Sequence, residues 1–113
     1  MKLPATLSGR AEADLTNQYR WYLLNANDEV AERFLAAFRL TVRELEAVPG
    51  LGRLRRFRSA ELANLRSFPI SRPYESFLIF YRFEADRVSA ERVMHGSRDL
   101  ERRLVEPPED YPS

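Results

Sequence analysis

Three side chains in the second half of the chain have types that could cleave a phosphodiester bond. His95 is the only imidazole in the sequence, and an imidazole can take up a proton near neutral pH. Arg98 follows three positions later, where a guanidinium could neutralise charge on one phosphate, while Tyr81 could return a proton. The structural interpretation of His95 is favoured, because a histidine that ends a strand before Gly96 often satisfies backbone groups of the turn.

Two arginines could have either a structural role or a binding role. Arg98, next to Asp99 at the expected start of a helix, either pairs across the sheet or contacts a phosphate or a protein partner. Arg82 follows Tyr81 in a strongly apolar stretch, where a buried guanidinium needs a partner. We therefore expect Arg82 to be a buried, paired arginine rather than a surface contact.

A second group of residues is of the kind that binds macromolecules. Four arginines stand within six positions around Phe57, and such a run is either a solvated loop, the commoner case, or a landing site for an acidic protein surface. Trp21 lies off the apolar stripe of its helix, and an exposed tryptophan often anchors an interface. The candidate partner-binding residues are Tyr19, Trp21, Tyr22, Arg53, Arg55, Arg56, Arg58 and Arg98.

The composition excludes several classes of chemistry. With no Cys and a single His, the chain offers no thiol nucleophile, disulfide framework or multi-histidine site, so we expect no metal and no cofactor. No apolar run is long enough for a signal-peptide core or a membrane span, which predicts a cytoplasmic protein without a membrane partner. Net charge is only +1, but residues 51–103 carry twelve Arg against seven acids, which favours an anionic partner there.

The elements that must position these residues begin with two helices. Apolar residues recur at helical spacing over about 9–24, after Ser8 as the N-cap, and again over 31–48. The Pro-Gly pair at 49–50 ends the second helix, and the short polar connection makes the two helices an antiparallel hairpin. The predicted buried stripes are Ala11, Leu15, Tyr19, Tyr22 and Leu23, followed by Ala31, Phe34, Phe38, Val42, Leu45 and Val48.

The rest of the chain is predicted to form strands and one short helix. The expected strands lie within 1–7, 65–71, 76–84 and 88–95. The third of them is apolar on both faces, as a strand covered on both sides would be. Residues 50–63 are expected to be a loop, and a short helix capped by Ser97 should cover about 98–104 before a Pro pair stops it.

These elements define a single α+β domain over residues 1–104, followed by a flexible tail over 105–113. Its order is β-α-α-β-β-β with a short C-terminal helix. Consecutive strands joined by short turns make an antiparallel sheet, and the helix hairpin must cover one face of it. We expect two layers, with the hairpin packed on the sheet.

Five short motifs follow one another in this order over residues 3–104. They are Leu7-Ser8 with Ala11–Leu15, Ala31–Phe34, Pro49–Gly52, Leu65-Arg66, and Phe80–Arg82 with Arg92–Leu100. The nine residues Arg92–Leu100 are the most specific part of these motifs. Together the motifs resemble the RelE/ParE superfamily of toxins from bacterial type II toxin–antitoxin systems, and they lie closer to its ParE branch.

The resemblance implies a toxin held silent by a cognate antitoxin, ParD-like or similar, whose extended segment wraps it. One branch of the superfamily cuts messenger RNA on the ribosome, and the ParE branch poisons DNA gyrase. If this chain is a nuclease, the resemblance points to Arg66, Tyr81, His95 and Arg98 as its catalytic residues. Leu104, however, stands where that branch has a Tyr, and the strand around Arg66 has no Lys.

Three hypotheses about function follow. The first, favoured by the near-neutral charge and the incomplete catalytic set, is a gyrase poison that acts by protein binding and is not an enzyme. The second is a ribosome-dependent endoribonuclease. The third is an inactive remnant that only binds its antitoxin. We expect gyrase as the target, rather than the ribosome or messenger RNA.

Overall fold

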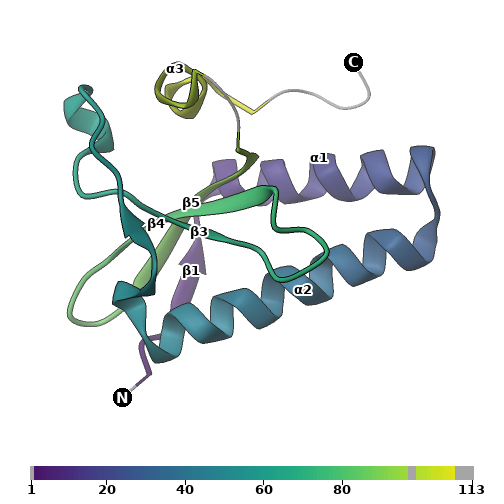
Figure 1. The fold of residues 1–113 in the computed structure, drawn as a ribbon, viewed down its shortest axis with the longest axis horizontal. Coiled ribbons are helices and arrows are strands. Elements are labelled where there is room, and N and C mark those ends of the chain that lie inside the picture. Colours follow the sequence, from purple (N-terminus) through teal and green to yellow (C-terminus); the bar gives the residue numbers. More distant parts are fainter. Residues whose placement is uncertain (1, 97–98, 109–113) are drawn as a thin grey trace.

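The computed structural model describes residues 2–96 and 99–108, which form a helix hairpin packed on a five-stranded sheet (Figure 1). In chain order the elements are β1 (Ala5–Leu7), α1 (Gly9–Asn25), α2 (Asp28–Ala47), the 3-10 turn η1 (Pro49–Leu51), β2 (Arg53–Leu54), the 3-10 turn η2 (Ala60–Leu62), β3 (Arg66–Pro69), β4 (Phe77–Phe83), β5 (Val88–His95) and α3 (Leu100–Val105). The predicted α+β fold and its order are confirmed. The one added strand, β2, lies in the segment that was expected to be a loop.

Local sequence signals fix both ends of the hairpin. The Ser8 hydroxyl accepts a hydrogen bond from the N–H of Ala11 at 3.0 Å, as an N-cap does. The side chain of Asn27 does the same for the N–H of Val30 at the start of α2. α2 stops just before Pro49, whose ring cannot continue the helical hydrogen bonds.

The sheet has the strand order β1-β5-β4-β3-β2 and is antiparallel except at one edge. β1 pairs with β5 in parallel, with Ala5 opposite Val88 and Leu7 opposite Ala90. The prediction of a wholly antiparallel sheet was therefore wrong for this pair. The two helices that follow β1 form a connection long enough for the chain to return beside β1 in the same direction, which short turns do not allow.

A bulge in β5 changes which of its side chains face the helices. Phe80 lies opposite Arg92, but the next residue, Tyr81, lies opposite Ala90, so Glu91 is an extra residue in β5. A strand alternates its side chains between faces, and one extra residue reverses that alternation. Ala90 and Val93 therefore both face the helix hairpin. In a regular strand, two residues three positions apart would face opposite sides of the sheet.

The larger core lies between the hairpin and the sheet. Phe34 and Phe38 of α2 pack in one cluster with Ile79 and Tyr81 of β4, and each is 5 % exposed or less. Phe34 makes tilted or edge-to-face ring contacts with Tyr22, Tyr74 and Phe77, geometries that aromatic rings prefer.

A smaller core lies on the opposite face of the sheet. Phe80 and Met94 pack there with Leu62 of η2, Leu65 and Leu104 of α3. Figure 1 shows α3 across the sheet from α2. The prediction that β4 is covered on both faces is confirmed, and α3 and η2 supply the second cover.

Some predicted boundaries and buried positions need correction. Leu23 and Val48 were assigned to the buried stripes, but both are exposed. Leu23 lies in the last turn of α1, and Val48 follows the end of α2. α3 begins at Leu100 and ends at Val105, which packs against the second core instead of belonging to a tail. The predicted cap, Ser97, and residues 109–113 lie outside the described residues.

Candidate functional site

Tyr81 is buried completely in the middle of β4. Its hydroxyl accepts a hydrogen bond from the N–H of Gly52 at 2.8 Å and donates one to the C=O of Pro49 at 2.7 Å. Burial raises the pKa of this hydroxyl above its ordinary value of 10.0. Tyr81 thus holds the turn after α2 in place, and its proton faces a carbonyl and not an open surface.

Arg66 of β3 lies directly opposite Tyr81 and holds the same turn. Its guanidinium donates to the C=O of Gly52 at 2.8 Å and lies 5.5 Å from the centre of the Phe83 ring. The guanidinium of Arg66 is therefore occupied by a backbone carbonyl oxygen and by the face of an aromatic ring. Arg66 and Tyr81, proposed as catalytic partners, are therefore neighbours that share a structural task.

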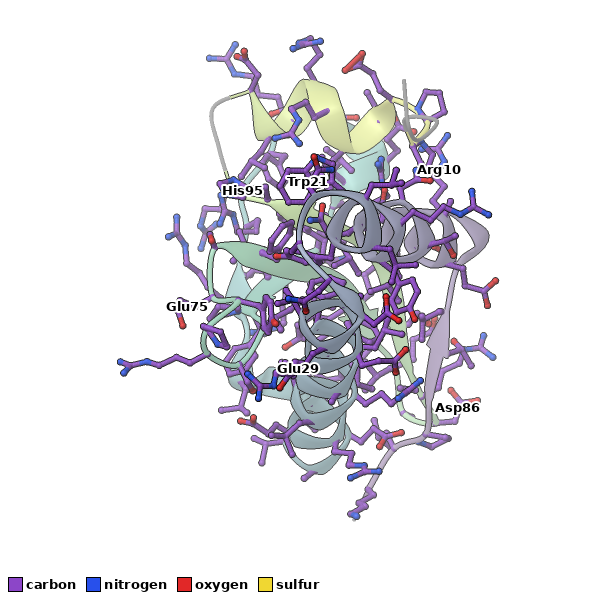
Figure 2. All side chains as sticks on the ribbon, turned by 90° about the vertical axis from the view of Figure 1, so that its right-hand side faces the viewer. Arg10, Trp21, Glu29, Glu75, Asp86 and His95 are labelled. Atoms are coloured by element: carbon purple, nitrogen blue, oxygen red, sulfur yellow. The ribbon has the colours of Figure 1, made fainter. Side chains whose placement is uncertain are left out.

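His95 lies at the other end of the sheet, where the chain leaves β5 toward α3 (Figure 2). It is paired with Phe77, four residues before Tyr81 along β4, which places it about 13 Å from Tyr81 at the rise of an extended strand. Its Nδ1 lies 3.0 Å from the C=O of Gly96, and its ring packs edge-on against Phe77. The favoured interpretation, a histidine bonded to turn backbone, agrees with this geometry.

The described residues of the nuclease set do not form one site. Arg66 and Tyr81 lie together, His95 lies apart from them, and Arg98 lies outside the described residues. Leu104, at the position of the nuclease Tyr, is buried in the second core. Arg82 is paired, as predicted, but it is only partly buried and not fully buried. Its guanidinium contacts the carboxylate of Glu91 and donates to two backbone carbonyls of the segment before β3.

The arginine run extends across β2 into the loop that follows. Arg53 and Arg56 are exposed, whereas Arg55 is partly buried, donates to the Ser67 hydroxyl at 3.2 Å and lies over the Phe57 ring. Burial lowers the pKa of Arg55, and the nearby charge of Arg53 lowers it further. The run is thus a crowded basic surface with one member packed down.

The end of this loop is fastened to α3. The carboxylate of Glu101 accepts hydrogen bonds from the N–H groups of Arg58 at 3.0 Å and Ser59 at 2.9 Å. The side chain of Arg58 remains exposed. The loop therefore has fixed attachments at both ends, at Gly52 and at Ser59.

The aromatic candidates on α1 differ in exposure. Tyr22 is half-buried against Phe34 and Tyr74, whereas Trp21 is 37 % exposed and meets Tyr22 edge-on. Figure 2 shows Trp21 on the side of α1 away from α2. Tyr19 is hydrogen-bonded to the carboxylate of Glu32, and that bond raises its pKa. Among the described residues, Trp21 is exposed while Tyr19 and Tyr22 are partly buried, so of the three Trp21 is the best placed to contact a partner.

A buried ion pair that the sequence analysis did not single out connects three elements. Arg92 of β5 contacts Asp14 of α1 through Nε at 2.8 Å and Nη2 at 3.1 Å, and both side chains are 8 % exposed or less. Arg92 also donates to three carbonyls near the end of α3, those of Arg103, Leu104 and Glu106. The sequence contained a hint of this ion pair. Arg92 stands directly before two apolar residues of a predicted strand, and Asp14 stands directly before Leu15 of the apolar helix stripe.

Asp14 also shows why α1 runs along β5. β1 ends at Leu7, so the edge of β5 beyond it has no strand partner. There, the N–H of Val93 donates to Asp14 at 2.9 Å and the C=O of Glu91 accepts from Ser8 at 2.8 Å. Side chains at the start of α1 therefore replace the missing strand.

No metal or membrane feature is present within the described ranges. Over residues 2–96 and 99–108, no group of three or more His, Cys, Asp or Glu side chains is placed to hold a metal ion. In the same part of the chain, no helix is both long enough and apolar enough to cross a membrane.

Comparisons with known proteins agree with this architecture. Residues 5–100 match the family described as the ParE toxin of the type II toxin–antitoxin system parDE. A solved structure described as the chromosomal ParDE toxin–antitoxin system from P. aeruginosa is similar in fold, with a TM-score of 0.68 at 19 % identity, over 85 % of this chain and 98 % of that chain. No curated protein sequence matches the chain. Because the family match runs from β1 into α3, the chain belongs to the ParE toxin family of type II toxin–antitoxin systems.

Proposed function

We propose that this chain is a cytoplasmic toxin that inhibits DNA gyrase by binding it, and that a cognate ParD-like antitoxin neutralises the toxin. Family membership supports the toxin role. The observation that favours binding over RNA cleavage is the structural role of Tyr81. Its buried hydroxyl accepts one hydrogen bond from the turn after α2 and donates another to it. A hydroxyl held in this way has no access to a substrate phosphate.

The spacing of the other candidates supports the same conclusion. A nuclease must place a proton acceptor, a proton donor and a cation around one phosphate. His95 is about 13 Å from Tyr81 along the sheet, and Arg66 is directed at the turn carbonyls instead. A protein that acts by binding requires no such convergence.

Two assays on the purified chain test the target. The first measures gyrase supercoiling and the accumulation of cleaved DNA complexes, and the second measures cleavage of ribosome-bound messenger RNA. The variants are His95→Ala, which removes the sole imidazole at an exposed position, and Arg72→Ala, a control at an exposed residue of the β3–β4 connection. We expect gyrase inhibition by the wild type and by both variants.

The possible results separate the three hypotheses. Message cleavage that is lost in His95→Ala and retained in Arg72→Ala, without an effect on gyrase, would establish the endoribonuclease instead. Inactivity of the wild type in both assays, with intact antitoxin binding, would identify a remnant that only binds its antitoxin. Gyrase inhibition that persists in His95→Ala supports the proposal.

We place the antitoxin on the hairpin, where α1 ends in exposed apolar residues. Trp21 is 37 % and Leu24 is 63 % exposed, and an aromatic anchor beside an aliphatic side chain is typical of a binding hot spot. Hydrogen exchange with and without the antitoxin should show protection within residues 15–40. Trp21→Ala should weaken binding at least tenfold, whereas Val48→Ala, at an exposed apolar position after the end of α2 and outside residues 15–40, serves as the control.

A further inference from the structure

The end of β5 presents backbone groups outward, at the edge of the sheet. The N–H of Gly96 donates to the C=O of Ser76 at 2.8 Å, so these two residues form a hydrogen-bonded pair. In an antiparallel ladder such pairs alternate with non-hydrogen-bonded ones. His95 is therefore a non-hydrogen-bonded position, and so is Val93 two residues earlier. The backbone N–H and C=O of both residues consequently point away from β4.

The first and last of these four groups have partners on the helices. The N–H of Val93 donates to Asp14 of α1 at 2.9 Å, and the C=O of His95 accepts from Arg103 of α3 at 3.3 Å. Both bonds reach β5 from outside the sheet, in agreement with the direction that the register gives. The two groups between them are the C=O of Val93 and the N–H of His95, and neither has a partner within residues 2–96 and 99–108.

A cleft of about 210 Å³ lies beside these two open groups. Gln18 of α1 and Pro107, which follows α3, both line it. Because α1 and α3 cover opposite faces of the sheet, the space between them continues the plane of β5. One water molecule takes up about 30 Å³ in the liquid, so the cleft has room for a flat ring system.

The acidic residues that line the cleft are paired with arginines. Asp14 forms the buried ion pair with Arg92, and the carboxylate of Glu106 is bonded to Arg102 at 3.0 Å. Arg103 adds a further positive charge to the lining. The cleft therefore suits an uncharged ring, with a cation nearby for an attached phosphate.

The open groups also determine the hydrogen-bonding pattern of a ligand. The C=O of one residue and the N–H of the second residue after it face the same way, and in a parallel ladder one residue of the neighbouring strand bonds to both. A ligand must likewise place a donor next to an acceptor. Adenine does so with its 6-amino group and its ring nitrogen N1, on the base edge that proteins bind in unpaired nucleotides. An added strand would need more open groups, but Asp14 and Arg103 occupy the adjacent ones.

We propose that the edge of β5 at Val93 and His95 is a binding site for an adenine base, supplied by a free nucleotide or by a nucleic acid strand. The 6-amino group donates to the C=O of Val93, and N1 accepts from the N–H of His95. The ring lies in the plane of the sheet between Gln18 and Pro107, with Arg103 beside it. The site goes beyond gyrase binding and does not depend on it.

The first test uses nuclear magnetic resonance on the full chain with adenosine monophosphate as the probe. We expect its addition to shift the amide signal of His95 and to leave those of residues 53–58 unchanged. Inosine monophosphate has an acceptor where adenine has the amino group and a donor at N1, so it should bind at least tenfold more weakly. The adenosine monophosphate analogue with a dimethylated amino group lacks the donor and should be equally weak.

A short single-stranded RNA of adenosines distinguishes the two sources of the base. If the RNA shifts the same signal at lower concentration than the mononucleotide does, the base comes from a strand. If the mononucleotide binds as tightly as the RNA or more tightly, the base comes from a free nucleotide. Neither measurement uses gyrase, so failure of this proposal and failure of the gyrase proposal are distinguishable.

Two variants at one position test the backbone bond. His95→Pro removes the outward N–H, which makes no bond to β4, and proline is tolerated at such an edge position. His95→Ala removes the imidazole and keeps the N–H. We expect His95→Pro to bind adenosine monophosphate at least tenfold more weakly than His95→Ala, and Arg72→Ala to bind it as the wild type does. The comparison with inosine monophosphate needs no variant, so the proposal remains testable if the proline variant does not fold.

Several outcomes would overturn the proposal. Equal binding of adenosine and inosine monophosphates would mean that only the phosphate is bound. Shifts confined to residues 53–58 would place the nucleotide on the arginine run instead. Unchanged affinity in folded His95→Pro, or no binding of either the mononucleotide or the RNA, would also reject the site.

Discussion

Replacing Asp14 by Ala is expected to destabilise the fold far more than the loss of an ordinary ion pair. The substitution removes two hydrogen bonds to the guanidinium of Arg92 and the acceptor for the N–H of Val93. Both side chains of the pair are 8 % exposed or less, so the guanidinium of Arg92 would lose its buried counter-charge. Arg92 would keep only its bonds to carbonyls at the end of α3.

The magnitude follows from this burial. Removing one member of a buried ion pair costs about 3–5 kcal/mol, because the remaining charge is left without a counter-charge. A domain of this kind has a total stability of roughly 5–15 kcal/mol. We therefore expect Asp14→Ala to lose a large fraction of the free energy of unfolding, with α3 released from the sheet at lower denaturant concentration than the hairpin.

Urea titration followed by circular dichroism measures this loss. The matched control is Glu29→Ala, which breaks the pair with Arg33 on the surface of α2, where both side chains are about two-thirds exposed. Such a pair contributes about 0–1 kcal/mol. The double variant Asp14→Ala with Arg92→Met should cost less than the sum of the single variants, because it leaves no unpaired charge.

The reasoning would be refuted by a small effect. If Asp14→Ala costs about as little as Glu29→Ala, or if the Asp14 and Arg92 variants add without coupling, the pair is not the buried connection that its geometry indicates. Hydrogen exchange provides a second check, because Arg92→Met should speed exchange in residues 100–105 before it affects α2.

Three further predictions concern the core and the turn after α2. Phe34→Ala should cost about 3–5 kcal/mol in a denaturant titration, because the ring is completely buried; a loss below about 1 kcal/mol would contradict the assigned core. Gly52→Ala should lower the melting temperature, because its new Cβ would lie 2.5 Å from the Tyr81 hydroxyl oxygen and 2.9 Å from the Ser67 carbonyl oxygen. An unchanged melting temperature would mean that the turn is loosely held. Because burial raises the pKa of Tyr81 above 10.0, the unfolded chain loses that proton first and the free energy of unfolding should fall as the pH rises above about 10. Tyr81→Phe should flatten this fall, and identical pH profiles for the two proteins would contradict the assignment.

The helix hairpin, its caps and its end could be predicted from the amino-acid sequence alone. Helical periodicity, the Ser8 cap and the break at Pro49 depend on residues close together in the chain, so they were readable without a fold. The same holds for the apolar strand β4, whose burial on both faces follows from its unbroken apolar run. Local patterns also carried the resemblance, because each motif spans only a few residues.

Which groups from distant parts of the chain meet could not be predicted, because it depends on the tertiary fold. The parallel pairing of β1, the extra residue Glu91 in β5 and the short strand β2 depend on how the chain returns to the sheet, and no local pattern specifies that return. The bulge is decisive, because one extra residue reverses which face every later side chain occupies. His95 is close to Arg98 in the sequence, but the register of β4 and β5 places it far from Tyr81. The packing of α1 against β5 brings Asp14 to Arg92, which are far apart in the sequence.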